Sequence, residues 1–365
     1  MFLVAVVATL LITPLHAEDL ADSVPDPVPY AQIHIWATAW DQDSNPTTDP
    51  AGYGDPEDDT GFKVRRVRAG VTGEADSWRY RLGTGMTAPY DGLTPRGGKE
   101  MEVESAWIGY KPLDSVWLTA GYQEVPVSRE ALMSSQELVL AERSVAGEWV
   151  APNRDVGVIM DHQSGDRIRT RINLGAFNGN ESVTGDHNTG LLFAGRAEVV
   201  IGPGDVYSTV GAVSETTFAF AFDGWRDDDV ATNTTGLGAD VMFRHGGLSV
   251  SAEGRGVLLA PAGSDLDQPD VLSETKRMGA HGQVSYSPTA FESAHGGVEI
   301  AARFGVFDDD MDVDDNGDVG EVMGGVTWSG YDNHVRFGGG YVHRMEFGGV
   351  GVGNDTVRFW WLMKI

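Results

Sequence analysis

The feature that most constrains this chain is a two-residue alternation of apolar and polar side chains, which recurs in short segments. The clearest segments are 167–177, 297–307, 334–344 and 357–365. In 297–307, the apolar positions are Val298, Ile300, Ala302, Phe304 and Val306. Side chains of a β-strand point alternately to opposite faces, so each segment is expected to be a strand with one apolar and one polar face.

The links between these segments alternate in length. Short, turn-rich links fall at 74–77, 112–114, 163–166, 202–205, 244–247 and 329–333. Long polar links fall at 41–61, 87–100, 124–154, 178–190, 257–276, 308–318 and 345–354. The stretch 206–233 is interpreted as a long strand followed by a loop around DGWRDDD. This count gives about sixteen strands with both chain ends at the short-turn end, which is typical of a transmembrane antiparallel β-barrel.

A soluble sandwich or propeller also uses alternating strands, but its loops would not be sorted by length in this way. Aromatic residues near the strand ends favour the membrane barrel, whose interfaces carry aromatic girdles. They are Trp36, Trp40, Trp78, Trp107, Tyr110, Trp117, Tyr286, Trp328, Tyr341 and Trp361. We therefore predict an all-β chain that forms a transmembrane antiparallel β-barrel.

The N-terminus supports export. Residues 1–17 form an apolar run that is broken by Pro14 and closed by Ala17, which predicts a signal peptide followed by a barrel at 18–365. The alternative is a buried N-terminal strand or helix. No later apolar stretch approaches the roughly 18 residues of a membrane helix. An exported chain of this kind enters a membrane only as a closed barrel, which predicts the outer membrane of a Gram-negative-type bacterium.

Charge and cysteine content exclude several classes of protein. The chain has 26 basic and 54 acidic residues, a formal net charge of −28. Nucleic acid is not expected as a partner, because a phosphate backbone requires a basic face. The absence of cysteine excludes a disulfide framework and a thiolate metal site.

Residues 122–158 resemble the third-loop region of the phosphate-selective porin O and P family. The similarity lies in Val-Pro-x-Ser-Arg-Glu at 125–130, Ser134-Ser135, Glu142-Arg143-Ser144 and Pro-x-Arg-Asp-x-Gly-Val at 152–158. Segments 62–82 and 175–180 also resemble the family. The resemblance implies a sixteen-stranded, usually trimeric barrel, with a long loop folded inward as a constriction. It also implies an anion pathway lined by arginines, with lysines at the narrowest point.

Two features depart from the family pattern. The predicted constriction loop 124–154 contains no lysine, and its bases Arg129, Arg143 and Arg154 share it with five glutamates. Dedicated phosphate capture is therefore not expected. The chain ends in Ile365, where such barrels commonly end in an aromatic residue.

The alternation itself predicts an arginine-lined lumen, since an arginine on the lipid face costs roughly 2–4 kcal/mol at mid-depth. A row of guanidinium groups suits carboxylate and phosphate groups and lets an anion pass between weak sites. The predicted pathway residues are Arg66, Arg68, Arg79, Arg81, Arg129, Arg143, Arg167, Arg169 and Arg171. The adjacent pair Arg65–Arg66 breaks the alternation and predicts a bulge. The alternative is that the arginines pair with Glu102, Glu104, Asp155 and Glu198 on other strands.

Two loops carry further signals. Ser134-x-x-Glu137 is a capping box, which predicts a short helix in loop 124–154 and favours an ordered constriction over a surface lid. In 308–318, Asp312-x-Asp314-x-Asn316-Gly317 matches the first half of a calcium loop, although Met323 stands at the twelfth position. Asp312, Asp314, Asn316 and Asp318 are thus candidate ligands of Ca²⁺ or Mg²⁺. The alternative is a solvated acidic loop.

The sequence predicts an outer-membrane porin for small hydrophilic solutes, with weak preference for anions such as phosphate or organic anions. The histidines occur singly and no nucleophile motif accompanies them, so enzymatic activity and a required cofactor are not expected. The expected partners are outer-membrane lipid, small anionic solutes and two further copies in a homotrimer. The alternatives are an adhesive barrel with a blocked lumen and cation-binding loops, and a channel specific for oligosaccharides or organic acids.

Overall fold

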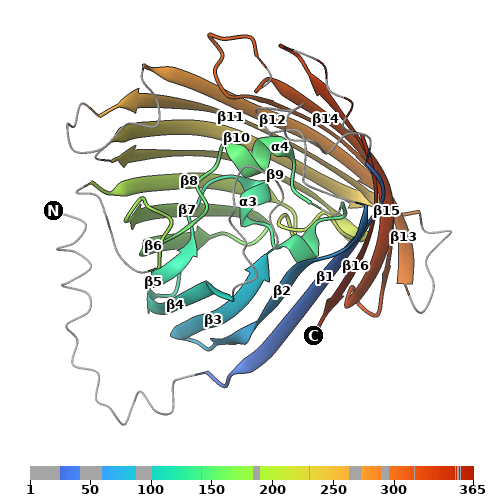
Figure 1. Cartoon of the computed structure of the whole chain (residues 1–365). Coiled ribbons are helices and arrows are strands. Elements are labelled where there is room, and N and C mark those ends of the chain that lie inside the picture. The colour runs from blue at the N-terminus through green and yellow to red at the C-terminus, as the bar shows by residue number, and fades with distance from the viewer. Residues whose placement is uncertain are drawn as a thin grey trace.

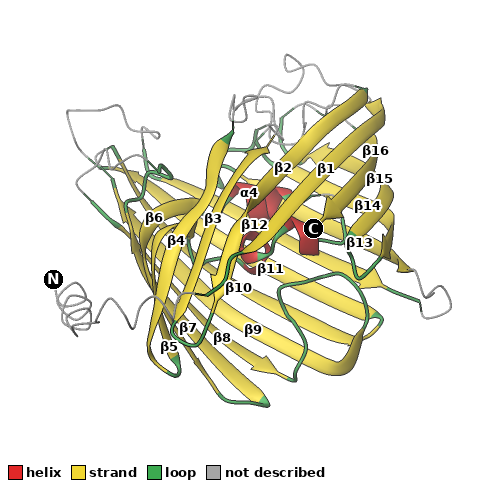
Figure 2. Cartoon of the chain, turned by 90° about the horizontal axis from the view of Figure 1, so that it is seen from below, coloured by secondary structure: helices red, strands yellow, loops and turns green. Residues whose placement is uncertain are grey.

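The computed structural model describes residues 25–41, 60–87, 101–140, 142–183, 190–229, 231–262, 273–288, 296–315, 317–349, 351, 353 and 355–365. Within them, sixteen antiparallel strands close into one barrel (Figures 1 and 2). The strands are β1 Val28–Asp41, β2 Gly61–Glu74, β3 Trp78–Thr87, β4 Glu102–Leu113, β5 Val116–Glu124, β6 Arg154–Ser164, β7 Ile168–Phe177, β8 Leu192–Ile201, β9 Val213–Asp228, β10 Thr232–Gly246, β11 Leu248–Pro261, β12 Thr275–Tyr286, β13 Gly296–Asp308, β14 Val319–Gly330, β15 Val335–Glu346 and β16 Thr356–Lys364. The predicted fold class is confirmed.

The barrel is closed by its first and last strands. β1 pairs with β16 in an antiparallel register, with Gln32 opposite Lys364. Beyond the end of β16, Ala31 and Ile365 exchange two backbone hydrogen bonds of 3.2 and 3.0 Å. The beginning of the first strand and the end of the last therefore lie at the same rim, as the even strand number requires.

The apolar faces of the strands point outward and the polar faces point inward, which is the reverse of a soluble protein. On β13, Ile300 points outward with an exposed fraction of 52%, whereas Arg303 points inward with 2%. The same outward apolar exposure recurs around the barrel, for example at Phe193, Phe222 and Leu237. This is the lipid-facing apolar band and polar interior of an outer-membrane barrel. Among the described residues, no helix has the length and apolarity to cross a membrane.

Only part of the expected aromatic girdle lies on the outer surface. Trp78 packs on Tyr110 with ring centroids 4.8 Å apart, and Trp328 packs on Phe337 at 5.7 Å. Trp36, in contrast, is fully buried inside the barrel, where the Arg358 guanidinium lies 3.9 Å from the centre of its ring. The position of an aromatic residue near a strand end thus did not determine the face that it occupies.

The long third loop folds into the lumen, as predicted. It carries the helix α3 (Arg129–Leu132), the 3₁₀ helix η1 (Ser135–Glu137) and the helix α4 (Val145–Trp149). The strands surround α3 and α4 (Figures 1 and 2). Serines cap all three: the side chains of Ser128, Ser134 and Ser144 accept hydrogen bonds from backbone N–H groups of the first turns. The capping box at Ser134 therefore begins a single 3₁₀ turn.

The interpretation of 206–233 as one strand and one loop was wrong. β9 occupies Val213–Asp228, so most of DGWRDDD lies in a strand, and only 229–231 separate β9 from β10. The link between β8 and β9 spans 202–212 and is not a tight turn at 202–205. Val206 and Val210 of this link are buried inside the barrel. The predicted bulge in β2 is confirmed, because His34 lies opposite Arg66 whereas Ile35 lies opposite Val64.

Candidate functional site in the barrel lumen

The inward loop is bonded to one side of the barrel wall. Its contacts run from Glu198 of β8 through β16 and on to β1 and β2. Examples are the Ser128 N–H, which donates to Asp223 of β9, and Gln32 of β1, which donates to Ser135. Between them, Arg336 of β15 donates to the backbone carbonyls of Gln136 and Leu138. The loop is therefore held against this side of the wall, where a cavity of about 190 Å³ remains beside Trp149 and Val150.

Two groups of buried ion pairs, here called ties, fasten the loop to the wall. The first tie is centred on Glu142. Arg66 of β2 places two guanidinium nitrogens 2.5 and 2.6 Å from its carboxylate oxygens, and the bulged Arg65 places another at 3.1 Å. All three side chains are buried. Burial by itself raises the pKa of Glu142, but the two arginines outweigh it and hold the pKa well below its usual range. Glu142 therefore stays ionised and holds the loop at neutral pH.

A second tie is a buried network of three arginines and four acids. Arg129 of α3 lies 2.7 Å from both Glu198 and Asp240. The other members are Arg196, Arg255, Asp223 and Glu253, joined by ion pairs of 2.5 to 3.4 Å. Each charge has an opposite charge within contact distance, and the three arginines and four acids leave one net negative charge.

Open space remains on the other side of the lumen, along β3 to β8. One cavity of about 260 Å³ lies between the loop and the wall and is lined by Arg79, Trp107, Asp161, Arg171 and Tyr207, among others. A second cavity of about 340 Å³ lies toward the short-turn rim and is lined by Arg169, Arg171 and Tyr207, among others. The two cavities share Arg171 and Tyr207 and therefore adjoin. They form the candidate pathway.

The charged side chains of this pathway differ in how far they are exposed to the cavities. Asp161 accepts two hydrogen bonds from Arg171 at 3.1 and 2.8 Å and lies 3.9 Å from Arg79. The side chain of Asp161 is only 2% exposed, whereas those of Arg79 and Arg171 are 21% and 34% exposed. Arg79 also lies 4.5 Å from the centre of the Trp117 ring. The acid thus lies behind the two guanidinium groups, which face the water.

The predicted pathway arginines lie in several different environments. Arg79, Arg169 and Arg171 line the cavities, and Arg169 donates to the carbonyls of Gly202 and Gly204. Arg68 and Arg81 lie 3.4 and 3.7 Å from Glu104, as the pairing alternative expected. Arg66 and Arg129 are buried in the two ties, which differs from the expectation of free lumen sites.

The remaining two predicted arginines lie elsewhere. Arg143 donates to the carbonyls of Glu130, Ala131 and Met133 and so fastens α3 within the loop. Arg167 lies in the exposed turn before β7, at the rim and not on the strand wall.

The sequence did not single out Asp161 or Tyr207. Asp161 shares a face of β6 with Ile159 and Asp155, and all three are buried. Alternation alone would have placed it inside, but nothing local marked Arg171 as its partner. Tyr207 belongs to the misinterpreted link 202–212. Its hydroxyl donates to both oxygens of Glu198 at 3.2 Å, and the link supports the loop through a 2.9 Å bond from the Thr209 N–H to the Glu137 carbonyl.

The candidate cation loop also differs from its prediction. Asp312 forms an exposed ion pair with Lys276 at 3.1 Å, and Asp314 is exposed. Asn316 lies outside the described residues. Asp318 is buried, and among the described residues its carboxylate groups with those of Asp309 and Asp315. The spacing motif therefore lies in the same loop as this carboxylate group and shares only Asp318 with it.

A closed sixteen-stranded barrel with an apolar exterior, a charged lumen and an inward third loop defines a porin of the bacterial outer membrane. The family model of phosphate-selective porin O and P matches residues 42–215, so this part of the chain is similar to that family. A comparison with curated protein sequences gives no match.

Solved structures agree on the fold. OprB of Pseudomonas putida is 11% identical and superposes with a TM-score of 0.58, covering 95% of this chain and 96% of its own. The anion-selective porin from Comamonas acidovorans is 9% identical with a TM-score of 0.55, covering 93% and 98%. OmpT of Vibrio cholerae is 9% identical with a TM-score of 0.56, covering 93% and 97%. At such identities the likeness concerns the barrel architecture.

Proposed function

We propose that this porin is a passive channel for small hydrophilic solutes with a weak preference for anions. The proposal is based on one observation: the arginines of the pathway are exposed to the cavities, whereas the aspartate behind them is buried. A solute in the two adjoining cavities meets the guanidinium groups of Arg79 and Arg171 before the carboxylate of Asp161. Paired donors on a planar cation suit carboxylate and phosphate oxygens.

The preference is expected to be weak, because acids also line the pathway. Glu124 is 40% exposed beside Arg154 and lines the cavity between the loop and the wall, and Glu198 and Asp205 line the cavity near the rim. The loop 124–154 contains no lysine, so micromolar phosphate affinity is not expected. A series of partly neutralised sites favours passage over capture.

The test is a planar-bilayer recording of the reversal potential in a salt gradient. The parent channel is expected to prefer anions, and the double variant Arg79→Ala, Arg171→Ala is expected to shift the potential toward cations. Arg226→Ala is the matched control, because Arg226 pairs with Asp228 at an exposed position outside the pathway. A cation-selective parent channel that the double variant leaves unchanged would overturn the proposal.

An organic-acid channel is the second candidate, and one observation favours it. Trp107 and Tyr207 line the same cavity as Arg79 and Arg171, so apolar ring faces lie beside the guanidinium groups. A channel that uses them would be blocked by benzoate at concentrations at which acetate has no effect. Equal behaviour of the two anions would leave the unspecific channel as the function. The adhesive alternative is disfavoured by the inward position of the loop and by the open cavities beside it.

We further propose a homotrimer, exported with residues 1–17 as a cleaved signal peptide. The trimer is supported by the similarity of residues 42–215 to the porin family and by the apolar exterior, which a wall-to-wall contact would cover. Sequencing the N-terminus of protein extracted from outer membranes tests the cleavage, for which Glu18 is the expected first residue.

A further inference from the structure

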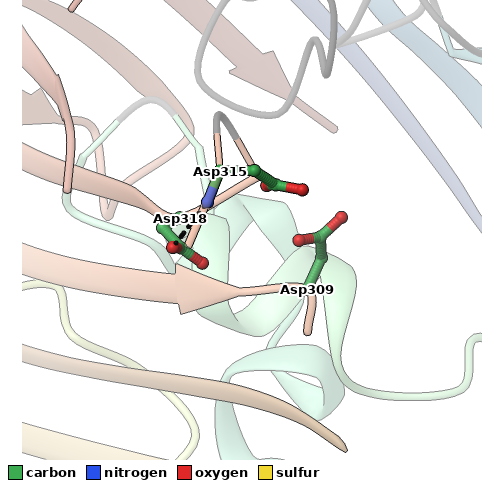
Figure 3. Close-up of side chains that lie close together, drawn as sticks. All are labelled: Asp309, Asp315 and Asp318. Carbon is green, nitrogen blue, oxygen red and sulfur yellow. Dashed lines mark hydrogen bonds between the residues drawn. The ribbon is translucent and has the colours of Figure 1, made fainter. Parts of the chain in front are cut away.

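Three carboxylates from one external loop lie together at the end of the barrel away from the chain termini. They belong to Asp309, Asp315 and Asp318, in the segment between β13 and β14, and each has an oxygen within 4.8 Å of the others (Figure 3). Asp309 directly follows β13, and Asp318 directly precedes β14. The group is therefore held at both ends by strands of the rigid barrel.

The loop is folded around this group. The Gly317 N–H donates to the Asp315 carboxylate at 2.6 Å, and the Asp315 N–H donates to Asp318 at 3.2 Å. The Phe347 N–H, from the neighbouring loop, donates to the Asp318 carbonyl at 2.7 Å. A methyl group at Gly317 would lie 2.1 Å from a carboxylate oxygen of Asp309, so the missing side chain makes room for that carboxylate.

One carboxylate oxygen of Asp318 and one of Asp309 lack a hydrogen-bond donor among the described residues. Asp318 is only 7% exposed, and its Oδ1 has no hydrogen-bond partner within the described part of the chain. The same holds for Oδ1 of Asp309 and of Asp308, the last residue of β13. A buried carboxylate oxygen without a donor is costly, and an ion that contacts several such oxygens removes the cost.

The nearby basic side chains do not supply this compensation. Lys276 pairs with Asp312 at 3.1 Å, and Arg277 donates to the backbone carbonyl of Asp309 at 3.3 Å.

We propose that Asp309, Asp315 and Asp318 bind one Ca²⁺ ion. Carboxylate oxygens are the hard ligands that Ca²⁺ and Mg²⁺ prefer. Ca²⁺ fits better, because it accepts six to eight oxygens in irregular geometry, whereas Mg²⁺ requires a near-ideal octahedron. Asp315 is exposed, which leaves positions for water. The site does not depend on the Asp312-x-Asp314 motif, whose side chains point to solvent and to Lys276.

Binding would stiffen the mouth of the barrel across two loops. A methyl group at Gly348, in the link between β15 and β16, would lie 2.6 Å from the Asp315 backbone and 2.8 Å from Asp318. The two loops therefore pack directly on each other at the site. An ion that holds Asp315 and Asp318 also fixes the surface against which Phe347 and Gly348 pack.

The test is Ca²⁺ binding and thermal unfolding of the folded barrel in detergent, after treatment with chelator and at constant ionic strength. Ca²⁺ is expected to bind with a stoichiometry near one per chain and to raise the unfolding temperature saturably, by mass action on the native state. Mg²⁺ is expected to bind more weakly. Asp318→Asn and Asp309→Asn should each weaken binding by at least about tenfold, a loss that even outer-shell partners of a metal cause.

The control is the double variant Asp312→Asn, Asp314→Asn, which removes two charges from the same loop and should retain binding. Gly317→Ala tests the geometry of the site without a change of charge. It keeps all the acids but displaces the Asp309 carboxylate, so it should weaken Ca²⁺ binding. The proposal is overturned if Ca²⁺ at millimolar concentration neither binds the parent nor raises its unfolding temperature. It is also overturned if the control loses binding as much as Asp318→Asn, since that indicates diffuse attraction by an acidic loop.

Discussion

Arg66 of β2 and Glu142 of the inward loop form a buried paired contact, although they lie 76 positions apart in the sequence. Two nitrogens of one guanidinium group meet two oxygens of one carboxylate, which fixes direction as well as distance. Arg65 reaches the same carboxylate because the bulge in β2 turns two successive side chains inward. The loop is thereby anchored to β2, which pairs with β3, the first of the strands along the open pathway.

Glu142→Gln is expected to loosen this anchor. Removing one partner leaves two buried arginines without their counterion, which costs roughly 3–5 kcal/mol. We expect a lower unfolding temperature and noisier single-channel current, measured by heat-dependent electrophoretic mobility and bilayer recording. Glu148→Gln in the same loop removes an equal charge, which acts on Arg66 through its charge and not through the paired hydrogen bonds that Glu142 makes, and serves as the control. Equal effects of the two substitutions would contradict the anchoring role of Glu142.

The ion pairs between Glu142 and the two arginines are also expected to persist at mildly acidic pH. The pKa of Glu142 is lowered in the folded state, so its contribution to stability is fully present above the unfolded pKa of about 4.3 and is lost only as the pH falls through the much lower folded value. Single-channel conductance is therefore expected to stay constant between about pH 8 and pH 5, as far as Glu142 controls it. A loop transition within that range that Glu142→Gln abolishes would show that the carboxylate titrates there.

The wall beneath α4 contains a matched pair of glycines. A methyl group at Gly279 of β12 would lie 2.9 Å from Val150, whereas one at Gly305 of β13 would meet Val145 at an ordinary 3.5 Å. We expect Gly279→Ala to push the end of α4 away from the wall and change conductance, and Gly305→Ala to be tolerated. The measurement is single-channel conductance of both variants. The reverse order would contradict the packing of α4.

Substitutions of two buried aspartates, Asp161 and Asp240, are expected to have different effects, one on ion selectivity and the other on stability. Asp161→Asn frees Arg79 and Arg171 in the open pathway and should increase the anion preference. Asp240→Asn removes the same charge from the closed network around Arg129 and Arg196, so it should lower stability and change selectivity less. Reversal potentials and unfolding temperatures of the two variants test this pair. If Asp240→Asn changed selectivity as much as Asp161→Asn, ions would pass through the network.

Assembly is tested by native electrophoresis in mild detergent. We expect a heat-labile species of about three chains, because barrels of this size often bury one wall against neighbours. A monomer under all mild conditions would reject the homotrimer.

The sequence determined the barrel. In a strand the direction of each side chain follows from its position, so the alternation of Ile300 with Arg303 placed one in lipid and the other in the lumen without reference to the rest of the fold. The broken alternation at Arg65–Arg66 likewise marked the bulge. The family motif at 125–130 correctly implied an inward loop, although a periodicity argument could not place it.

Only the tertiary structure decided which charges meet. Arg129 pairs with Asp240, 111 positions away, and Glu142 with Arg66, because barrel closure and the path of the loop bring them together. Arg129 and Arg171 are both arginines expected in the lumen, yet one is enclosed by acids and the other faces an open cavity. The difference depends on where the loop and the link 202–212 fill the interior. Side-chain direction is a local property of the strand, whereas occupancy of the lumen depends on contacts between segments far apart in the sequence.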